Sequence, residues 1–181
     1  MNKQYITIIS YGHFERDFLT KIAESVFHEY GYTVVIEENH LDMTEYYDPS
    51  RRQYDGNKLL TEINAHCQAE AIKTVGLFSV DLFIPILTYI FGQAFLHGRS
   101  GIASVYRLRN ELYGMQQNNE LLLARFVKVV LHELGHNFGL KHCHSPGCVM
   151  LSSTYVEDID QKNAGLCPQC RIEIGDSILS V

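Results

Sequence analysis

Three histidines within one short stretch, HELGHNFGLKH at residues 132–142, have the types and spacing of a catalytic metal site. His132 and His136 are four residues apart, so on a helix their imidazoles project from one face and can bind the same ion. Gly139 can adopt the left-handed backbone that ends a helix, and the turn brings His142 back as a third ligand. Three neutral imidazoles leave one position of a tetrahedral zinc open for water, which is typical of catalytic zinc.

Glu133 follows the first histidine and lies one residue further round the helix. From there its carboxylate can reach a water on the metal without binding the metal, so we predict that it is the general base. The pattern therefore predicts a zinc-dependent peptidase. Two alternatives stay open: the zinc could be purely structural, or the protein could bind peptides at the zinc without cutting them. Neither alternative needs a glutamate at this position.

Four of the five cysteines form a second candidate metal site near the C-terminus. Four residues separate the first pair and two separate the second, a spacing that matches tetrahedral zinc sites built from four thiolates: Cys143, Cys148, Cys167 and Cys170. We therefore expect a structural zinc, and two zinc ions per chain in all. Free thiols or two disulfides are the alternatives, and His144 is a conceivable substitute ligand. Cys67 falls in a helical pattern and is interpreted as a buried apolar residue.

Hydrophobic patterns upstream of these motifs predict alternating strands and helices. Strands are expected over three segments rich in β-branched or aromatic residues, 5–10, 33–38 and 73–80. Helices are expected over residues 15–30 and 57–71, and a polar loop over residues 39–56. This β-α-β-α-β order indicates a largely parallel sheet with crossover helices.

The elements next to the histidine motif are predicted to be an edge strand and a long helix. The apolar segment 82–97 is ambiguous, but Ala94–His97 and Ile102–Arg107 are expected to pair as antiparallel strands across a short turn. An extended substrate could add to the exposed edge near residues 94–98. Residues 119–138 are expected to form the helix, with a stripe of apolar residues at helical spacing: Leu123, Val127, Val130, Leu131, Leu134 and Phe138.

Three further polar residues border the expected cleft. His97 could contact substrate, although an exposed edge-strand histidine is the favoured interpretation. Tyr155 could reach the metal or an oxyanion, but ordinary packing is favoured. Asp81 follows a predicted strand and is interpreted as a capping or solvent-exposed residue.

The chain resembles the archaemetzincins, a family of metzincin zinc metallopeptidases, in three consecutive motifs: HELGHNFGLKHC, CVM at residues 148–150 and CPQC at residues 167–170. The apolar segment 80–94 is also similar, so the resemblance covers at least residues 80–170. One departure is visible, because the 16 residues between Met150 and Cys167 are one fewer than in the family's pattern. Loops tolerate such a change.

The resemblance implies a metzincin-like α/β (α+β) fold. Its mixed, mostly parallel sheet would have an antiparallel edge strand and would pack on helices that include the active-site helix. Residues 1–139 would form an N-terminal lobe, and residues 140–181 a small C-terminal lobe fastened by zinc. A change in composition near residue 140, where glycine, proline and cysteine replace periodic apolar residues, agrees with this boundary.

The resemblance also implies roles for single residues. The catalytic zinc would lie on His132, His136 and His142, with Glu133 as the general base. The four C-terminal cysteines would hold the structural zinc. Met150 would form the Met-turn beneath the catalytic metal, by packing rather than by ligation. The enzyme is expected to stand alone, without a pro-segment.

Composition and charge exclude several other classes of protein. The 181 residues suffice for one catalytic domain with its own core. A net charge of -6 does not provide the basic face of a nucleic-acid binder, and no apolar run is long enough to span a membrane. The start, MNKQYITIIS, lacks the features of a signal peptide. We therefore expect a cytoplasmic monomer that acts on a peptide or protein substrate. A role of the cysteine-rich lobe in docking a partner stays open, as does the choice between trimming N-termini and cutting within chains.

Overall fold

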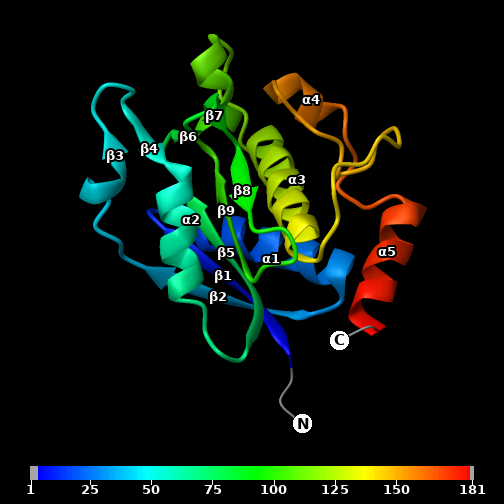
Figure 1. Cartoon of the computed structure of the whole chain (residues 1–181). Coiled ribbons are helices and arrows are strands. Elements are labelled where there is room, and N and C mark those ends of the chain that lie inside the picture. Colours follow the sequence, from blue (N-terminus) through cyan, green and yellow to red (C-terminus); the bar gives the residue numbers. More distant parts are fainter. Residues whose placement is uncertain (1–3, 180–181) are drawn as a thin grey trace.

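A five-stranded mixed sheet in the order β2-β1-β5-β9-β8 forms the centre of the protein. The computed structural model describes residues 4–179, and side chains as far as residue 175. Four strands run parallel, namely β1 (Tyr5–Tyr11), β2 (Thr33–Asn39), β5 (Ala71–Phe78) and β9 (Ser100–Ser104). At the edge, β8 (Gly92–Ala94) pairs antiparallel with β9 (Figure 1). The predicted mixed, mostly parallel sheet with an antiparallel edge strand is confirmed.

Helices cover both faces of this sheet (Figure 1). α1 (Arg16–Tyr30) and α3 (Asn119–Asn137) share one apolar core with the sheet, and α2 (Gly56–Ala65) shares another. Val75 and Leu77 of β5 face the first core, whereas Phe78 faces the second. Because successive side chains of a strand point to opposite faces, a strand buried on both sides must be apolar throughout. No helix within residues 4–179 is long and apolar enough to cross a membrane.

The edge strand and the turn after it lie slightly earlier in the chain than predicted. The strand covers Gly92–Ala94 rather than Ala94–His97, and His97 lies in the turn with a φ of 56°. The partner strand ends at Ser104, and a 3-10 helix, Tyr106–Leu108, replaces the end of the predicted strand. The interpretation of His97 as an edge-strand residue is therefore wrong, although its side chain is exposed.

The end of α2 corrects the predicted helix over residues 57–71. The helix stops at Ala65, so Cys67 lies beyond it, half-buried, with its Sγ donating to the carbonyl of Ile63 (3.4 Å). It is therefore not the buried helical residue that the pattern indicated. The chain then reaches β5 through a turn rather than through more helix.

A second, four-stranded sheet in the order β3-β4-β6-β7 was not predicted. Two of its strands, β3 (Tyr47–Asp48) and β4 (Gln53–Asp55), occupy the predicted loop. The other two, β6 (Leu82–Ile84) and β7 (Leu87–Ile90), occupy the ambiguous apolar segment. Strands of two to four residues are too short to show alternation, and β4 pairs with β6 across a long stretch of chain.

Asp81, which immediately precedes β6, is buried, and this corrects its interpretation as a capping or exposed residue. Its side chain forms an ion pair with Arg107 and accepts a hydrogen bond from Gln53 Nε2 (3.1 Å). Only 8% of the residue is exposed. A buried carboxylate requires a partner, and Arg107 and Gln53 supply it, so Asp81 links β4 of the second sheet to the 3-10 helix that follows β9.

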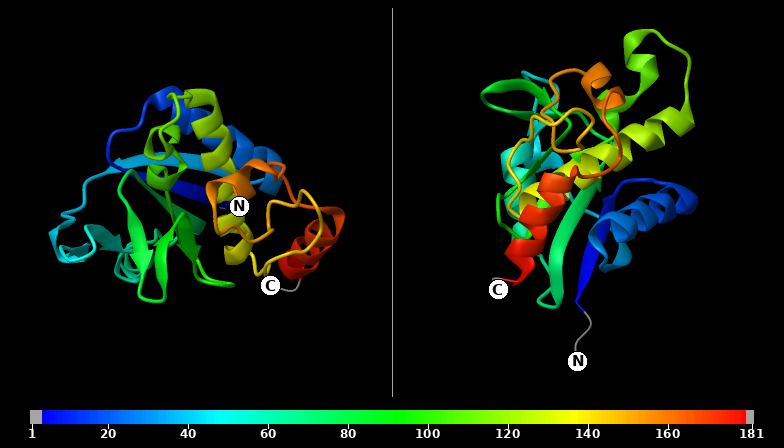
Figure 2. Two further views of the ribbon diagram at one scale, coloured as in Figure 1. Left: turned by 90° about the horizontal axis from the view of Figure 1, so that it is seen from above. Right: turned by 90° about the vertical axis from the view of Figure 1, so that its right-hand side faces the viewer.

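The segment after α3 lies beside that helix and contains α4 (Val156–Asp160) and α5 (Pro168–Leu179), as Figure 2 shows. Two short 3-10 helices, Thr44–Tyr46 and Asn110–Tyr113, complete the described elements. Arg125 of α3, which is 3% exposed, donates to both carboxylate oxygens of Asp160 (2.7 and 2.6 Å). This bidentate pair fastens α4 to α3.

Replacing Asp160 by alanine should lower the free energy of unfolding by about 3 kcal/mol, because Arg125 would keep a buried charge without its carboxylate. Urea denaturation measures this. The control is Asp17→Ala, which removes the partner of Lys21 in an exposed pair (2.8 Å) and should cost less than about 0.5 kcal/mol. Equal costs for the two substitutions would contradict the role given to the pair of Arg125 and Asp160.

Candidate active site

The two ends of α3 explain where the histidine motif lies. At the start, the Asn118 side chain accepts a hydrogen bond from the backbone N–H of Leu121 (3.0 Å) and caps the helix. At the end, Gly139 has a φ of 99° and its N–H donates to the carbonyl of His136 (2.9 Å). The predicted turn at Gly139 is confirmed, and it returns the chain toward the helix so that His142 lies near His132.

The three imidazoles converge on one point. The candidate ligand atoms of His132, His136 and His142 all lie within 4.8 Å of one another. The Nε2 atoms of His132 and His136 are 3.1 Å apart. In a tetrahedral zinc site with Zn–N distances of about 2.0–2.1 Å, neighbouring ligand atoms lie roughly 3.3 Å apart. The arrangement therefore fits a zinc ion.

Backbone carbonyls fix the protons of two imidazoles. His132 Nδ1 lies 2.8 Å from the carbonyl of Val149, and His136 Nδ1 lies 2.7 Å from the carbonyl of Leu140. Because a carbonyl oxygen only accepts hydrogen bonds, each Nδ1 carries the proton. Each Nε2 is then left with a lone pair directed at the common point, as metal ligation requires.

Burial keeps the histidines neutral. It lowers the pKa of His132 well below its usual value and also lowers the pKa of His136 and His142. The ammonium of Lys162 lowers all three further. Neutral imidazole is the form that binds metal, so at neutral pH little proton release would oppose metal binding.

Glu133 is buried beside the edge strand. Only 6% of the residue is exposed, and burial raises the pKa of its carboxyl to about 8, while the charge of Lys162 opposes this shift. A Cβ atom at Gly92 of β8 would lie 2.7 Å from Glu133 Oε1, so only glycine allows this approach. The carboxyl therefore lies where the edge strand and the histidines meet.

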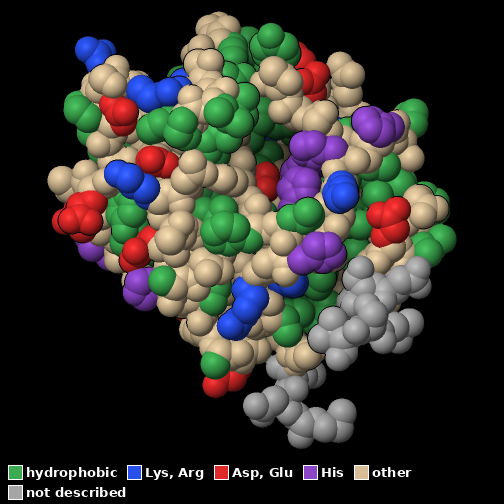
Figure 3. Space-filling view, in the orientation of Figure 1, with side chains coloured by type: hydrophobic (Ala, Val, Ile, Leu, Met, Phe, Trp, Pro, Cys, Tyr) green, Lys and Arg blue, Asp and Glu red, His purple; other side chains and the backbone are tan. Residues whose placement is uncertain are grey.

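A cavity of about 500 Å³ opens at these residues. Its walls come from β7 and β8, from one face of α3 and from the segment 152–155. Figure 3 shows a hollow with histidine side chains along one wall and an acidic side chain at its base. Tyr155, which is 64% exposed, lines the cavity. His97 is not among the residues that line the cavity. It lies at the end of α3 instead, where its backbone N–H donates to the carbonyl of His136 (3.0 Å) and its ring lies against Gly139.

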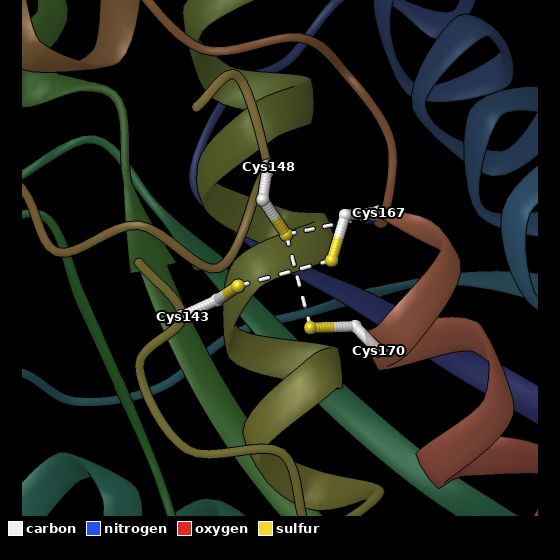
Figure 4. A group of neighbouring side chains, drawn as sticks. All are labelled: Cys143, Cys148, Cys167 and Cys170. Atoms are coloured by element: carbon white, nitrogen blue, oxygen red, sulfur yellow. Dashed lines mark hydrogen bonds between the residues drawn. The ribbon is translucent and has the colours of Figure 1, made fainter. Parts of the chain in front are cut away.

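The four C-terminal cysteines point toward one another (Figure 4). Two come from the loop after α3, one directly precedes α5, and one, Cys170, lies in the first turn of α5. The Sγ atoms of Cys143 and Cys167 are 3.8 Å apart, as are those of Cys148 and Cys170. Thiolates at about 2.3 Å from a tetrahedral zinc are separated by roughly 3.8 Å, whereas a disulfide requires about 2.05 Å. The cluster therefore fits zinc, and His144 is not part of it.

One short segment, residues 148–151, contacts both clusters. Cys148 belongs to the thiol cluster, and the next carbonyl, that of Val149, accepts from His132. The Met150 side chain lies against Gly135 of α3, where a Cβ atom would be 2.3 Å from its sulfur. Met150 is fully buried, and its contact point on α3 lies between His132 and His136 in the sequence of that helix, which agrees with its expected role in packing.

Two residues beside Glu133, Gly92 and Lys162, were not predicted from the sequence. The Nζ of Lys162 donates to the carbonyl of Leu151 and to that of Val149 (3.4 Å), and the side chain lines the cavity. Neither residue lies at a regular spacing from the histidine motif. Their proximity to Glu133 comes from tertiary contacts, so no local pattern could have indicated it.

Features of the fold and of the site together define a zinc metallopeptidase. They are a mixed sheet, a helix that carries the HExxH motif at residues 132–136, and an open cavity beside three converging imidazoles. Residues 33–176 match the family described as Peptidase family M54. This match covers most of the chain, and the chain therefore belongs to that family, the archaemetzincins. The resemblance that the motifs indicated is confirmed.

Relatives and solved structures agree with this membership. The chain is 45% identical over 125 residues to an archaemetzincin of Thermococcus kodakarensis, covering 68% of this chain and 67% of the relative. The crystal structure of archaemetzincin from Methanopyrus kandleri is similar with a TM-score of 0.85 at 29% identity, covering 98% and 97% of the two chains. That of the Archaeoglobus fulgidus archaemetzincin complexed with malonate has a TM-score of 0.78 at 30% identity, with 94% and 99% covered.

The raised pKa of Glu133 predicts a pH-dependent stability of the metal-free protein. The folded carboxyl has a pKa of about 8 against 4.5 when unperturbed, so the folded state binds the proton more tightly and loses stability as the pH rises between these values. Glu133→Gln removes this loss. The variant should therefore be more stable than the wild type by about 2–4 kcal/mol at about pH 8.5, and equally stable near pH 4.5.

Urea denaturation of both metal-free proteins across this pH range measures the effect. Comparison of the two proteins cancels the titration of the histidines, which both contain. Parallel stability curves from low to high pH would contradict the burial of a protonated carboxyl at Glu133.

Proposed function

We propose that this zinc metallopeptidase hydrolyses peptide bonds at a metal held by His132, His136 and His142. Glu133 acts as the general base. The observation that carries the proposal is the convergence of the imidazole nitrogens within 4.8 Å at the wall of an open cavity. Membership of a zinc-dependent peptidase family supports it.

The residues around this point have distinct tasks. Zinc bound there would lower the pKa of water to about 7 and polarise the peptide carbonyl. Glu133 takes a proton from the attacking water and delivers it to the leaving amine. Burial raises the pKa of this carboxyl, so the carboxylate is a stronger base toward the attacking water. The proton that it takes up is then available for the leaving amine. The carbonyls of Val149 and Leu140 keep two imidazoles oriented throughout.

The substrate would lie extended along β8. This strand is last in the order of the central sheet, so its outer edge can pair with a further strand. Gly92 has no side chain to block the approach of a peptide, and it lies against Glu133. An added strand would bring its carbonyl groups close to the histidines.

The four cysteines hold the second, structural zinc in this proposal. The ion would fasten the segment after α3, so that residues 1–139 and 140–181 act as two lobes with the cavity between them. The sulfur separations of 3.8 Å support this. A monomeric state and a cytoplasmic location stay predictions.

Replacing Glu133 by alanine should leave zinc bound and reduce kcat about 100- to 10,000-fold, because the base would be lost while the imidazoles remain. Zinc content and peptide hydrolysis are measured on the same preparation. If the variant hydrolyses peptides at the wild-type rate, Glu133 is not the base. If zinc-loaded wild type binds peptides from a diverse library but cuts none, the protein is a binder without turnover.

Replacing Cys170 by serine should reduce the zinc content from two ions per chain to one and lower the melting temperature, since a structural zinc contributes directly to folding. The matched control is Cys67→Ser, because Cys67 is a half-buried thiol outside the cluster. It should retain both ions. Elemental analysis and thermal unfolding measure the two effects, and an unchanged metal count in Cys170→Ser would refute the second site.

A further inference from the structure

The cavity carries more positive than negative charge. Among its described lining residues, Lys128 and Lys162 are basic and Glu133 is the only acidic residue. The chain as a whole has a net charge of -6. Two ammonium groups therefore line the cavity although acidic residues outnumber basic ones in the chain as a whole. A zinc ion bound to the histidines would add further positive charge.

Neither ammonium has a carboxylate partner among the described residues. Lys128 Nζ donates to the carbonyl of Ile159 (3.0 Å), and Lys162 Nζ donates to the carbonyls of Leu151 and Val149. An ammonium group has three N–H donors, so these contacts leave two on Lys128 and one on Lys162. Lys162 is 7% exposed and lines the cavity, so its remaining donor is available to a ligand there.

The acidic groups nearest to these lysines are already engaged. Asp160 accepts two hydrogen bonds from Arg125 (2.7 and 2.6 Å). Asp158 accepts from the backbone N–H groups of Thr154 and Tyr155 (2.8 Å each) at the start of α4. Among the described residues that line the cavity, Glu133 is left as the only carboxylate. Burial lowers the pKa of Lys128, and that of Lys162 to about 8, while the charge of Glu133 raises the pKa of Lys162. An anion that entered the cavity would therefore stabilise both charged forms.

The lysines lie close to the scissile bond. Lys128, His132 and His136 are four residues apart on α3 and share one face of the helix. Lys128 is therefore about 6 Å along the axis from His132. An extended peptide advances about 3.3 Å per residue, so this distance corresponds to about two residues of substrate.

We propose that Lys128 and Lys162 form a subsite for a carboxylate of the substrate within two residues of the bond that is cut. The carboxylate belongs to an acidic side chain or to the C-terminus of the peptide. This inference rests on the proposed peptidase function and gives that function a substrate class.

Three peptides test the subsite on the zinc-loaded wild type. Two are blocked at both ends and differ only in Glu or Gln near the scissile bond, and the third has Gln and a free C-terminal carboxylate. At least one of the carboxylate peptides should show a kcat/KM about tenfold or more above the blocked Gln peptide, as expected for a charge-assisted hydrogen bond. The peptide that gains identifies the source of the carboxylate. Equal kcat/KM for all three overturns the proposal.

Variants connect the preference to the two lysines. The preference is measured as the ratio of kcat/KM for the carboxylate peptide to that for the blocked Gln peptide, so that a change in the basal rate cancels. Lys128→Gln and Lys162→Gln should each bring this ratio close to one, and Lys162→Arg should restore it. The matched control is Lys73→Gln. Lys73 Nζ also donates to two carbonyls, those of Gly98 and Asn137 (2.9 and 2.8 Å), but it lies outside the cavity. A preference that survives Lys128→Gln overturns the proposal even if the Lys162 variant does not fold.

Peptide binding to zinc-loaded Glu133→Gln, followed by fluorescence anisotropy, gives a readout that is independent of turnover. The favoured carboxylate peptide should bind about tenfold more tightly than the blocked Gln peptide, and Lys128→Gln in this background should remove the difference. If no peptide is cut by the wild type, the proposed function fails, while a carboxylate preference in binding still supports the subsite. If the wild type cuts and binds the peptides equally well with and without the carboxylate, the subsite is refuted and the proposed peptidase function is not.

Discussion

The hydrogen bond between His132 Nδ1 and the carbonyl of Val149 connects the active-site helix to the cysteine cluster. Val149 follows Cys148 directly, so the orientation of this imidazole depends on a backbone that the thiol cluster positions. Such a bond sets the tautomer of a metal-binding histidine and directs its free nitrogen. The C-terminal segment is therefore part of the candidate active site, because it completes the environment of His132 on α3.

Burial gives the active-site groups their chemical properties. It keeps the imidazoles neutral, raises the pKa of the Glu133 carboxyl and lowers the pKa of the Lys128 and Lys162 ammonium groups. Each effect is a cost for the free protein, and each strengthens the interaction with a ligand of opposite charge, since electrostatic attraction grows as water is excluded. In our proposals, the same low-dielectric cavity serves metal binding, proton transfer and recognition of a carboxylate.

Long-range contacts also explain which parts of the fold escaped prediction. The alternation of strands and helices up to β5 was readable because each element is long enough to show its own period. The second sheet was not, since its strands of two to four residues are stabilised by partners distant in sequence, as in the pairing of Tyr54 with Leu82. Asp81 was misread for the same reason, because its partner Arg107 lies beyond the next strands.

The sequence by itself determined the features that depend on spacing along the chain. Two histidines one helical turn apart, a glycine that ends the helix and cysteines in pairs specify both clusters, because covalent geometry and helix periodicity fix where such side chains can point. Only the tertiary structure decided what surrounds them. The approach of Gly92 to Glu133 and the burial of Lys162 beside the histidines arise when distant segments pack together, and no local period records such contacts.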